Sequence, residues 1–358
     1  MTPTPLPELT LQRPVTILGI GQMGLVAATM LDASEADSGG RSLTLWGHDD
    51  DSRDSLAQKR DSDRLPSYKL PATARVARND AEAFQNERGE PCGLIVCAIP
   101  VQHIRETFTR LREFVPPGAG IVSCSKGIEN GTLLRPTQII ADTLRDDPDG
   151  PPRPLGTLSG PTIASELARG LPATMVAASD FPGFSTAMQA AFATRWLRVY
   201  THGDLLGVEL AGALKNVIAI AAGIVDGLQA GMNAKSALLA RGLAEITRLG
   251  TAMGASSETF FGVAGVGDLA TTCFSPEGRN RSCGEALGKG AKLETYLEES
   301  KFVVEGVATT KSVVDLAHRY RVELPIVRAV HDILFEGLDP LEAIGMLMSR
   351  DLKDERIG

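Results

Sequence analysis

The sequence contains little that would serve disulfide or metal chemistry. Its 358 residues include only five cysteines and five histidines. The cysteines are odd in number and form no Cys-x-x-Cys pair, which is typical of reduced cytosolic thiols. The histidines are far apart and have no zinc-site spacing. We therefore predict no metal centre.

The chain also lacks an excess of positive charge. Lys and Arg number 36 against 44 Asp and Glu, which gives a net charge of −8 and argues against nucleic acid or an anionic membrane as the main partner. The longest apolar or glycine run, 217–225, falls short of the roughly 20 residues of a membrane helix. The proline-rich segment 1–13 has no apolar signal core. We expect a cytoplasmic protein without stable membrane insertion, in which a local cluster of groups holds any anionic ligand.

The length and the apolar pattern predict two domains. Apolar runs at 15–20, 42–46, 93–99 and 120–124 alternate with helical segments such as 101–114, which is typical of a parallel sheet covered on both faces. From about residue 204, long helical runs replace the strand signals. These runs are expected at 205–228, 234–253, 280–287, 309–318 and 325–335. We predict a disordered lead over 1–13, an α/β domain over 14–200 and an all-α domain over 201–358.

The first strand runs directly into G-I-G-Q-M-G, which fits G-x-G-x-x-G at Gly19, Gly21 and Gly24. The pattern alone is weak, but here it follows a strand, opens a helix and begins a βαβ unit. Gly19 permits the turn, Gly21 leaves room for a pyrophosphate at the helix N-terminus, and Gly24 lets helix and strand pack closely. The α/β domain is therefore predicted to be of the Rossmann type and to bind a dinucleotide.

The second strand ends in W-G-H-D-D-D, so His48 occupies the position of the acidic residue that would contact the ribose 2′-hydroxyl of NAD. Asp49 lies beside it and Arg53 a little beyond. A histidine there neither requires a free hydroxyl nor repels a 2′-phosphate. The alternative interpretation, that His48 is simply a solvated loop residue, is equally well supported. We predict an adenosine-ribose contact for His48 and leave NAD and NADP both open, with NADPH slightly favoured.

Two further polar segments follow strands of the α/β domain. Lys126, in S-K-G, lies at the carboxyl edge of the sheet, where ligands of open α/β sheets bind. The segment L-S-G-P-T-I-A presents Thr162 and backbone amides at a second such edge. A Gly-Pro turn is most often only a turn, but two such edges beside a dinucleotide loop predict pocket walls.

In the helical half, Asp268 is expected in a glycine-flanked bend. Arg279 and Asn280, in S-P-E-G-R-N-R, begin a helix, where amides, helix dipole and guanidinium would form an anion site. A surface arginine is the ordinary alternative, and it is favoured if Arg279 faces bulk water. The pattern indicates a small phosphorylated or carboxylated substrate.

Lys215 lies inside the apolar helical run G-A-L-K-N-V-I-A-I-A-A-G. One turn away are only Ala211, Gly212, Ile218 and Ala219, so no carboxylate is placed to pair with it locally. Either its ammonium reaches water along the helix, or it is a partly desolvated amine in a cleft, whose pKa would be lowered.

These motifs, together with G-V-G-D-L and V-V-E-G, resemble in order those of bacterial NAD(P)-dependent glycerol-3-phosphate dehydrogenases from about residue 15 to 355. The resemblance implies reversible reduction of dihydroxyacetone phosphate to sn-glycerol 3-phosphate, which supplies phospholipid synthesis. It implies that Lys215 is the general acid/base, with Lys126 and Asp268 beside it. The implied substrate contacts are Lys126, Gly160, Thr162, Lys215, Asp268, Gly278, Arg279 and Asn280. The implied cofactor contacts are Gly19, Gly21, Gln22, Met23, Gly24, His48, Lys126, Ala164, Arg279, Val303 and Glu305.

The chain departs from this family at two places. Gln22 and Met23 replace a serine and an aromatic residue, and Gly278 replaces a serine. Two alternatives remain open, namely a related two-domain 3-hydroxyacid or hydroxyacyl dehydrogenase and a non-catalytic dinucleotide sensor. The apolar helices of the second half could also bury a homodimer interface.

Overall fold

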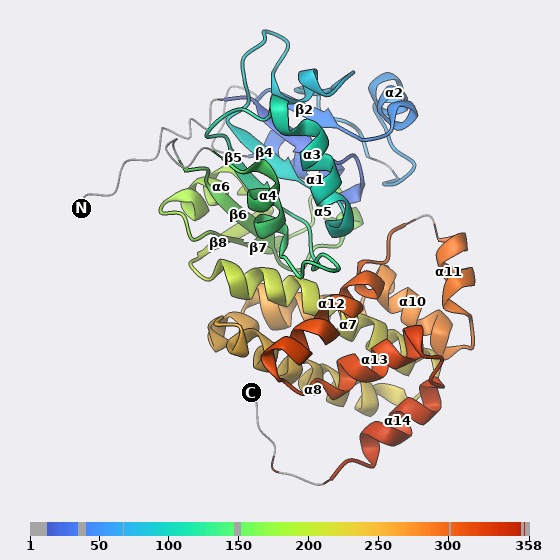
Figure 1. The fold of residues 1–358 in the computed structure, drawn as a ribbon. Coiled ribbons are helices and arrows are strands. Elements are labelled where there is room, and N and C mark those ends of the chain that lie inside the picture. Colours follow the sequence, from blue (N-terminus) through green and yellow to red (C-terminus); the bar gives the residue numbers. More distant parts are fainter. Residues whose placement is uncertain are drawn as a thin grey trace, which may run out of the picture. The chain divides into compact units, whose positions relative to one another are not determined.

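The computed structural model describes residues 13–34, 41–66, 68–146, 152–300, 302–351 and 354, so the predicted lead lies outside it except for Arg13. Contacts divide the chain into two compact units (Figure 1). The sheet unit comprises the described residues up to Ile99, His103–Ser125 and Pro136–Leu205. The helical unit comprises Pro100–Gln102, Lys126–Arg135 and the chain from Leu206 onward. Lys126 thus belongs to the helical unit, and the single boundary at 200–201 stays a prediction.

Eight strands of the described chain form one sheet in the order β3-β2-β1-β4-β5-β6-β7-β8. All neighbouring pairs are parallel except β6 and β7. The strands are β1 (Val15–Leu18), β2 (Leu43–Trp46), β3 (Ala74–Val76), β4 (Leu94–Cys97), β5 (Gly120–Ser123), β6 (Leu155–Ser159), β7 (Ala173–Ala178) and β8 (Leu197–His202). The first six strands have the order of a doubly wound dinucleotide-binding fold. The predicted Rossmann-type class is therefore confirmed.

The helices of the sheet unit follow from this strand order. They are α1 (Gln22–Asp32), α2 (Asp50–Lys59), α3 (Ile104–Leu111), α4 (Pro136–Leu144), α5 (Ala164–Ala168) and α6 (Phe184–Phe192), with a 3-10 turn at Ala81–Phe84. The order reverses between β1 and β4, so right-handed connections place α1 on one face and α3 and α4 on the other. Accordingly α1 packs with α5 and α6, and α3 packs with α4. The segment 101–114, predicted as one helix, is α-helical only over α3 and has 3-10 turns at both ends.

The helical unit is built around α7 (Leu205–Gly227). The other elements are α8 (Gly231–Ala252), a 3-10 turn at Ser257–Phe261, a π-helical turn at Val263–Gly267, α9 (Asp268–Phe274), α10 (Arg279–Gly288), α11 (Leu293–Glu299), α12 (Glu305–Tyr320), α13 (Pro325–Phe335) and α14 (Pro340–Met348). Among the described helices, α7 alone is long and apolar enough to cross a membrane. Its most apolar 18-residue segment is, however, wholly buried inside the protein. The core helix of a soluble protein has these same properties.

Helices α7 and α10 cross with their backbones in contact. A Cβ added to Gly223 would lie 1.9 Å from the carbonyl oxygen of Arg281, and one on Gly284 would lie 2.0 Å from that of Ile220. Beside this crossing the Asp226 carboxylate of α7 accepts from Arg281 of α10, and the distance between their charged atoms is 2.7 Å. The first turn of α10 is therefore held tightly against the helix that carries Lys215.

Candidate functional site

Lys215 is buried in the helical unit and is paired with a residue far along the chain. Its side chain is 8% exposed, and Nζ donates to Oδ1 of Asp268 at 2.7 Å. Lys126 donates to the other oxygen, Oδ2, at 2.6 Å, so one carboxylate bridges two ammonium groups. Of the two readings of Lys215 from sequence, the desolvated amine is correct and the snorkelling one is wrong.

The surroundings of Lys215 shift its acidity. The pKa of Lys215 is lowered to about 8, mainly because the amine is buried. The charge of Asp268 opposes this lowering, and the charge of Lys126 adds to it. Desolvation disfavours the charged form of an amine, as does a neighbouring like charge. An amine with such a pKa can exchange a proton near neutral pH.

The sequence predicted that Asp268 lies in a bend, and this prediction is wrong. Asp268 is the first residue of α9, directly after the π-helical turn at Val263–Gly267, and its side chain is 1% exposed. The two glycines of G-V-G, Gly265 and Gly267, thus lie in a helical turn. A side chain has no room at position 265, because a Cβ there would lie 2.1 Å from the Phe260 carbonyl oxygen. This close turn aims the first residue of α9 at Lys215.

Two further residues contact this cluster and were not identified from sequence. Nζ of Lys215 also donates to the hydroxyl of Thr272, which lies one helical turn after Asp268. The amide of Asn216 donates to the backbone oxygen of Lys126 at 3.4 Å. The i, i+4 spacing of Asp268 and Thr272 on one helix face was a signal that could have identified Thr272.

A second group forms at the start of α10. This helix begins at Arg279 after Gly278, and it has neither a capping side chain nor an acidic residue in its first turn. Asn280 is buried, and its side-chain oxygen accepts from the backbone amide of Gly306 at 2.9 Å. The first amides of α10 and the Asn280 side chain are therefore held in place at a helix terminus that favours an anion.

Arg279 is exposed, which is the condition that favoured an ordinary surface arginine. It is nevertheless held locally, because its guanidinium donates to the Val303 carbonyl oxygen at 3.3 Å and lies over the ring of Phe302 at 5.9 Å. Val303 is itself 47% exposed. The structure thus brings Arg279 and Val303 together at the surface of the helical unit.

Glu305, the first residue of α12, has an unusual carboxyl group. Among the described residues its Oε2 is buried without a hydrogen-bond partner, and so is the hydroxyl of Thr309 one turn later. Burial raises the pKa of Glu305 to about 7, against the opposing charge of Arg279. Buried polar atoms rarely remain unsatisfied, so these two atoms fit the polar end of a ligand.

The two groups of the helical unit are neighbours. A Cβ on Gly306 would lie 2.7 Å from the backbone oxygen of Asn216 and 2.8 Å from Oδ1 of Asn280. Asn216 follows Lys215 directly. The structure therefore brings the amine and the α10 anion site together within one unit.

In the sheet unit, the loop between β1 and α1 has the geometry of a dinucleotide cradle. Gly19 has φ +109°, and a Cβ on Gly24 would lie 1.8 Å from the Gly19 carbonyl oxygen. A Cβ on Gly21 would meet nothing within 4 Å, and α1 has neither a side-chain cap nor an acidic residue in its first turn. The helix N-terminus is thus open to a pyrophosphate.

The remaining predicted contacts of the sheet unit lie at the carboxyl ends of its strands. Gly160 is buried directly after β6, Thr162 is half-buried, and Ala164 begins α5. The position of His48 is exposed, beyond the end of β2.

At the first departure from the family pattern, the Gln22 amide donates to the backbone oxygen of Arg64 at 2.8 Å, and Met23 packs against the sheet core. Neither side chain is therefore an exposed stacking surface of the kind that an aromatic residue would supply.

The comparisons with known proteins agree with these features. A family model for the N-terminus of NAD-dependent glycerol-3-phosphate dehydrogenase matches residues 14–184, and one for its C-terminus matches 204–345. Glycerol-3-phosphate dehydrogenase [NAD(P)+] 2 of Salinibacter ruber is 42% identical over 95% of this chain and 96% of its own length. The Bacillus pumilus glycerol-3-phosphate dehydrogenase [NAD(P)+] is 42% identical over 94% of both chains. The crystal structure of glycerol-3-phosphate dehydrogenase from Coxiella burnetii has a TM-score of 0.86 and 33% identity, and covers 95% of this chain and all of that one. This chain belongs to the NAD-dependent glycerol-3-phosphate dehydrogenase family.

Proposed function

We propose that this protein catalyses the reversible reduction of dihydroxyacetone phosphate to sn-glycerol 3-phosphate with NADH or NADPH, in the cytoplasm, as a supply for phospholipid synthesis. The observation that carries the proposal is the buried amine of Lys215, held by Asp268 beside a helix terminus suited to a phosphate. The names of the relatives support it. The family match favours it over the hydroxyacid dehydrogenase and the sensor. A homodimer stays a prediction.

Lys215 is the proton donor in the reducing direction and the acceptor in the oxidising direction. Its pKa of about 8 leaves both protonation states accessible near neutral pH. As the substrate C2 oxygen gains negative charge, Lys215 gives it a proton, and Lys126 stabilises the same charge. General acid catalysis of this kind contributes roughly 10²- to 10⁴-fold in rate.

Asp268 orients both ammonium groups and compensates one of their two positive charges. Because its two oxygens are each directed to a different lysine, 2.7 Å and 2.6 Å away, the amines are fixed relative to each other. Thr272 supplies a further oxygen to Lys215. The donated proton therefore leaves from a fixed direction, which is what positioned acid catalysis requires.

The substrate phosphate binds at the start of α10. Its ligands are the open amides that follow Gly278, the Asn280 side-chain amide and the guanidinium of Arg279. A backbone amide here replaces the hydroxyl that a serine would give at position 278. Gly160 and Thr162 of the sheet unit are further proposed substrate contacts.

The open N-terminus of α1 and its glycine cradle fit the pyrophosphate of a dinucleotide. When bound, the nicotinamide supplies or accepts the hydride at C2. The proposed contacts of the dinucleotide as a whole are Gln22, Met23, His48, Lys126, Ala164, Arg279 and Val303. The buried Oε2 of Glu305 is an acceptor in need of a donor, as a carboxamide would provide.

The first test is the decrease in NADH and NADPH absorbance when the protein is mixed with dihydroxyacetone phosphate. We expect rapid oxidation that is absent with unphosphorylated dihydroxyacetone, because the α10 site acts through the phosphate. Cofactor binding without oxidation would reject the enzyme and favour the sensor.

The second test is the Lys215→Ala variant, which removes the proton donor. We expect turnover to fall by about 10²-fold or more, whereas cofactor affinity, measured by nicotinamide fluorescence, stays near that of the parent. The exposed Lys292→Ala is the matched control and should change neither quantity. Normal turnover with weakened cofactor binding would reject the catalytic role.

A further inference from the structure

Asp226, near the end of α7, has a carboxylate that the proposed reaction does not use. It follows Lys215 by about three helical turns, so the two residues lie on the same face of α7. Like Asp268, it accepts from two cations of other segments. Nε of Arg281 donates to its Oδ2 at 2.7 Å, and Nζ of Lys235 donates to Oδ1 at 2.9 Å and to Oδ2 at 2.7 Å. The helical unit therefore contains a second group in which one carboxylate joins two cations.

The three side chains of this group come from three helices and are largely removed from water. Asp226 belongs to α7, Lys235 to α8 and Arg281 to α10, and their side chains are 20%, 6% and 15% exposed. Burying charged groups costs solvation free energy, and apolar side chains of similar volume often stabilise a fold as well or better. The value of this group therefore lies in the geometry that it imposes.

The crossing of α7 and α10 shows which part of that geometry remains to be fixed. Four glycines lie along the crossing, and a Cβ on each would lie 1.9–2.5 Å from a backbone oxygen of the opposite helix: Gly223, Gly227, Gly284 and Gly288. These glycines set how closely the helices approach, but a contact without a side chain does not define the rotation of α10 about its axis. A charge-assisted hydrogen bond from a guanidinium is directional. The ion pair of Asp226 and Arg281 therefore fixes how the first turn of α10 is oriented.

The residues of R-N-R at the start of α10 have different surroundings. Arg279 is exposed and Asn280 is buried. Arg281, the third residue of the helix, instead pairs with Asp226 of α7 and, at 3.2 Å, with Glu285 one turn later in α10. Because Arg281 shares the first turn with Arg279 and Asn280, its contact with α7 determines where the α10 anion site lies.

The same group also contacts α9, the helix that begins with Asp268. Nζ of Lys235 lies 4.8 Å from the ring centroid of Phe274, the last residue of α9. Burial raises the pKa of the neighbouring Cys273 thiol to about 12, and charges from both carboxylate groups act on it, namely Lys215, Lys235, Asp226 and Asp268. The end of α9 is therefore close to both groups.

We propose that Asp226 is a positioning residue for the substrate phosphate. Through Arg281 it holds the first turn of α10 so that the open amides, Arg279 and Asn280 bind the phosphate together. The inference rests on the proposed function and adds a residue that acts on its phosphate site without touching the substrate. Without the carboxylate, Lys235 and Arg281 would repel each other, so Arg281 would move and the first turn of α10 would move with it.

The test is the steady-state kinetics of Asp226→Asn, which keeps the shape of the side chain and removes its charge. We expect KM for dihydroxyacetone phosphate to rise by about tenfold or more, which corresponds to ~1.4 kcal/mol. We expect kcat to change by less than about twofold, because the chemical groups at Lys215 are unchanged. The inhibition constant of inorganic phosphate, which occupies only the phosphate site, should rise in the same proportion as KM.

Glu285→Gln is the matched control, because it removes the other carboxylate that pairs with Arg281 but lies on α10 itself. It should leave KM and the inhibition by phosphate near those of the parent protein. Arg281→Lys keeps the positive charge without the guanidinium fork, so its KM should lie between those of the parent and Asp226→Asn. If Asp226→Asn does not fold, an unchanged KM in Arg281→Lys overturns the inference and a raised KM supports it.

A lower kcat at unchanged KM in Asp226→Asn would overturn the inference, because a smaller folded fraction reduces only the amount of active enzyme. An equal rise of KM in Glu285→Gln would also overturn it, and both outcomes leave the proposed function intact. If the parent protein does not reduce dihydroxyacetone phosphate, the proposed function fails, and the calorimetric Kd for inorganic phosphate decides the inference. Weaker binding by Asp226→Asn than by Glu285→Gln then supports it, and equal binding rejects it.

Discussion

The shared carboxylate of Asp268 is the contact whose removal changes the chemistry of Lys215 most directly. In the Asp268→Asn variant the side-chain shape remains, but the charge between the two ammonium groups is lost. Burial and the charge of Lys126 then act on Lys215 unopposed, and both lower its pKa. The variant should therefore have an amine that loses its proton at lower pH.

The expected size of the shift follows from the geometry. An opposite charge within about 4–6 Å changes a pKa by about 1–3 units, and Asp268 lies 2.7 Å from Nζ. Starting from about 8, the pKa of Lys215 in the variant should fall to between about 5 and 7. Each unit corresponds to about 1.4 kcal/mol.

The assay is the pH dependence of kcat/KM in both directions. Reduction requires protonated Lys215, so its rate is full below the pKa and falls as pH rises through it. Oxidation requires the neutral amine, so its rate rises with pH through the same value. Both limbs should move to lower pH in Asp268→Asn, whatever the loss in absolute rate.

A matched control is Asp315→Asn, which removes an exposed carboxylate from α12 and should leave both limbs in place. If the limbs of Asp268→Asn stay where they are in the parent protein, or move to higher pH, the assignment of the titrating group to Lys215 is refuted.

Two further predictions concern stability. Gly284→Ala should destabilise the protein by roughly 1–3 kcal/mol or more, because its Cβ would lie 2.0 Å from the Ile220 carbonyl oxygen. The control Gly345→Ala places its Cβ in open space on α14 and should instead stabilise the protein by about 0.5–1 kcal/mol. Equal free energies of urea unfolding for the two variants would contradict the close crossing of α7 and α10. Glu245 of α8 accepts from the amides of Ile326 and Val327, and burial raises its pKa to about 7. A raised folded pKa contributes stability that is present at low pH and lost as pH rises through about 7. Glu245→Gln should therefore gain stability relative to the parent by up to about 1.4 kcal/mol per pH unit between pH 5 and 7, and a pH-independent difference in urea unfolding would refute the titration.

Local pattern was enough for several parts of the protein. The loop from Gly19 to Gly24 could be interpreted because strand, turn and helix lie next to each other in sequence. Helix α13 was predicted with its observed bounds, since Pro325 fixes its first turn and the apolar positions repeat at helical spacing. The change from strands to long helices was visible because periodicity is a local property.

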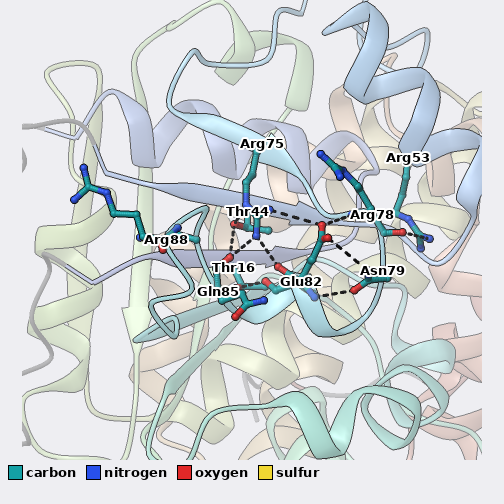
Figure 2. Close-up of polar contacts among 11 residues, drawn as sticks. Thr16, Thr44, Arg53, Arg75, Arg78, Asn79, Glu82, Gln85 and Arg88 are labelled. Carbon is teal, nitrogen blue, oxygen red and sulfur yellow. Dashed lines mark hydrogen bonds and ion pairs between the residues drawn. The ribbon is translucent and has the colours of Figure 1, made fainter.

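Helix α2 shows where local pattern fails. Its sequence D-D-S-R-D-S-L-A-Q-K buries only Arg53 and Leu56, so it carries almost no apolar periodicity. The helix is specified by its N-cap, Asp49, and by the hydrogen bonds that Arg53 donates to the backbone oxygens of Gly47 and Arg78 (Figure 2). The sequence placed Arg53 only a little beyond His48 and did not indicate its role, whereas in the protein it is a buried structural group.

The sequence by itself determined the order of the elements, the open cradle after β1 and the presence of a lysine in an apolar helix. Only the tertiary structure decided that this lysine meets Asp268, 53 residues further along the chain. It also decided that α10 crosses α7, the helix that carries the lysine, with their backbones in contact. The physical reason is that both contacts depend on how helices pack. Helix packing here depends on glycines and buried charged residues that lie on segments far apart in the sequence. A local sequence pattern does not indicate which of these segments come into contact.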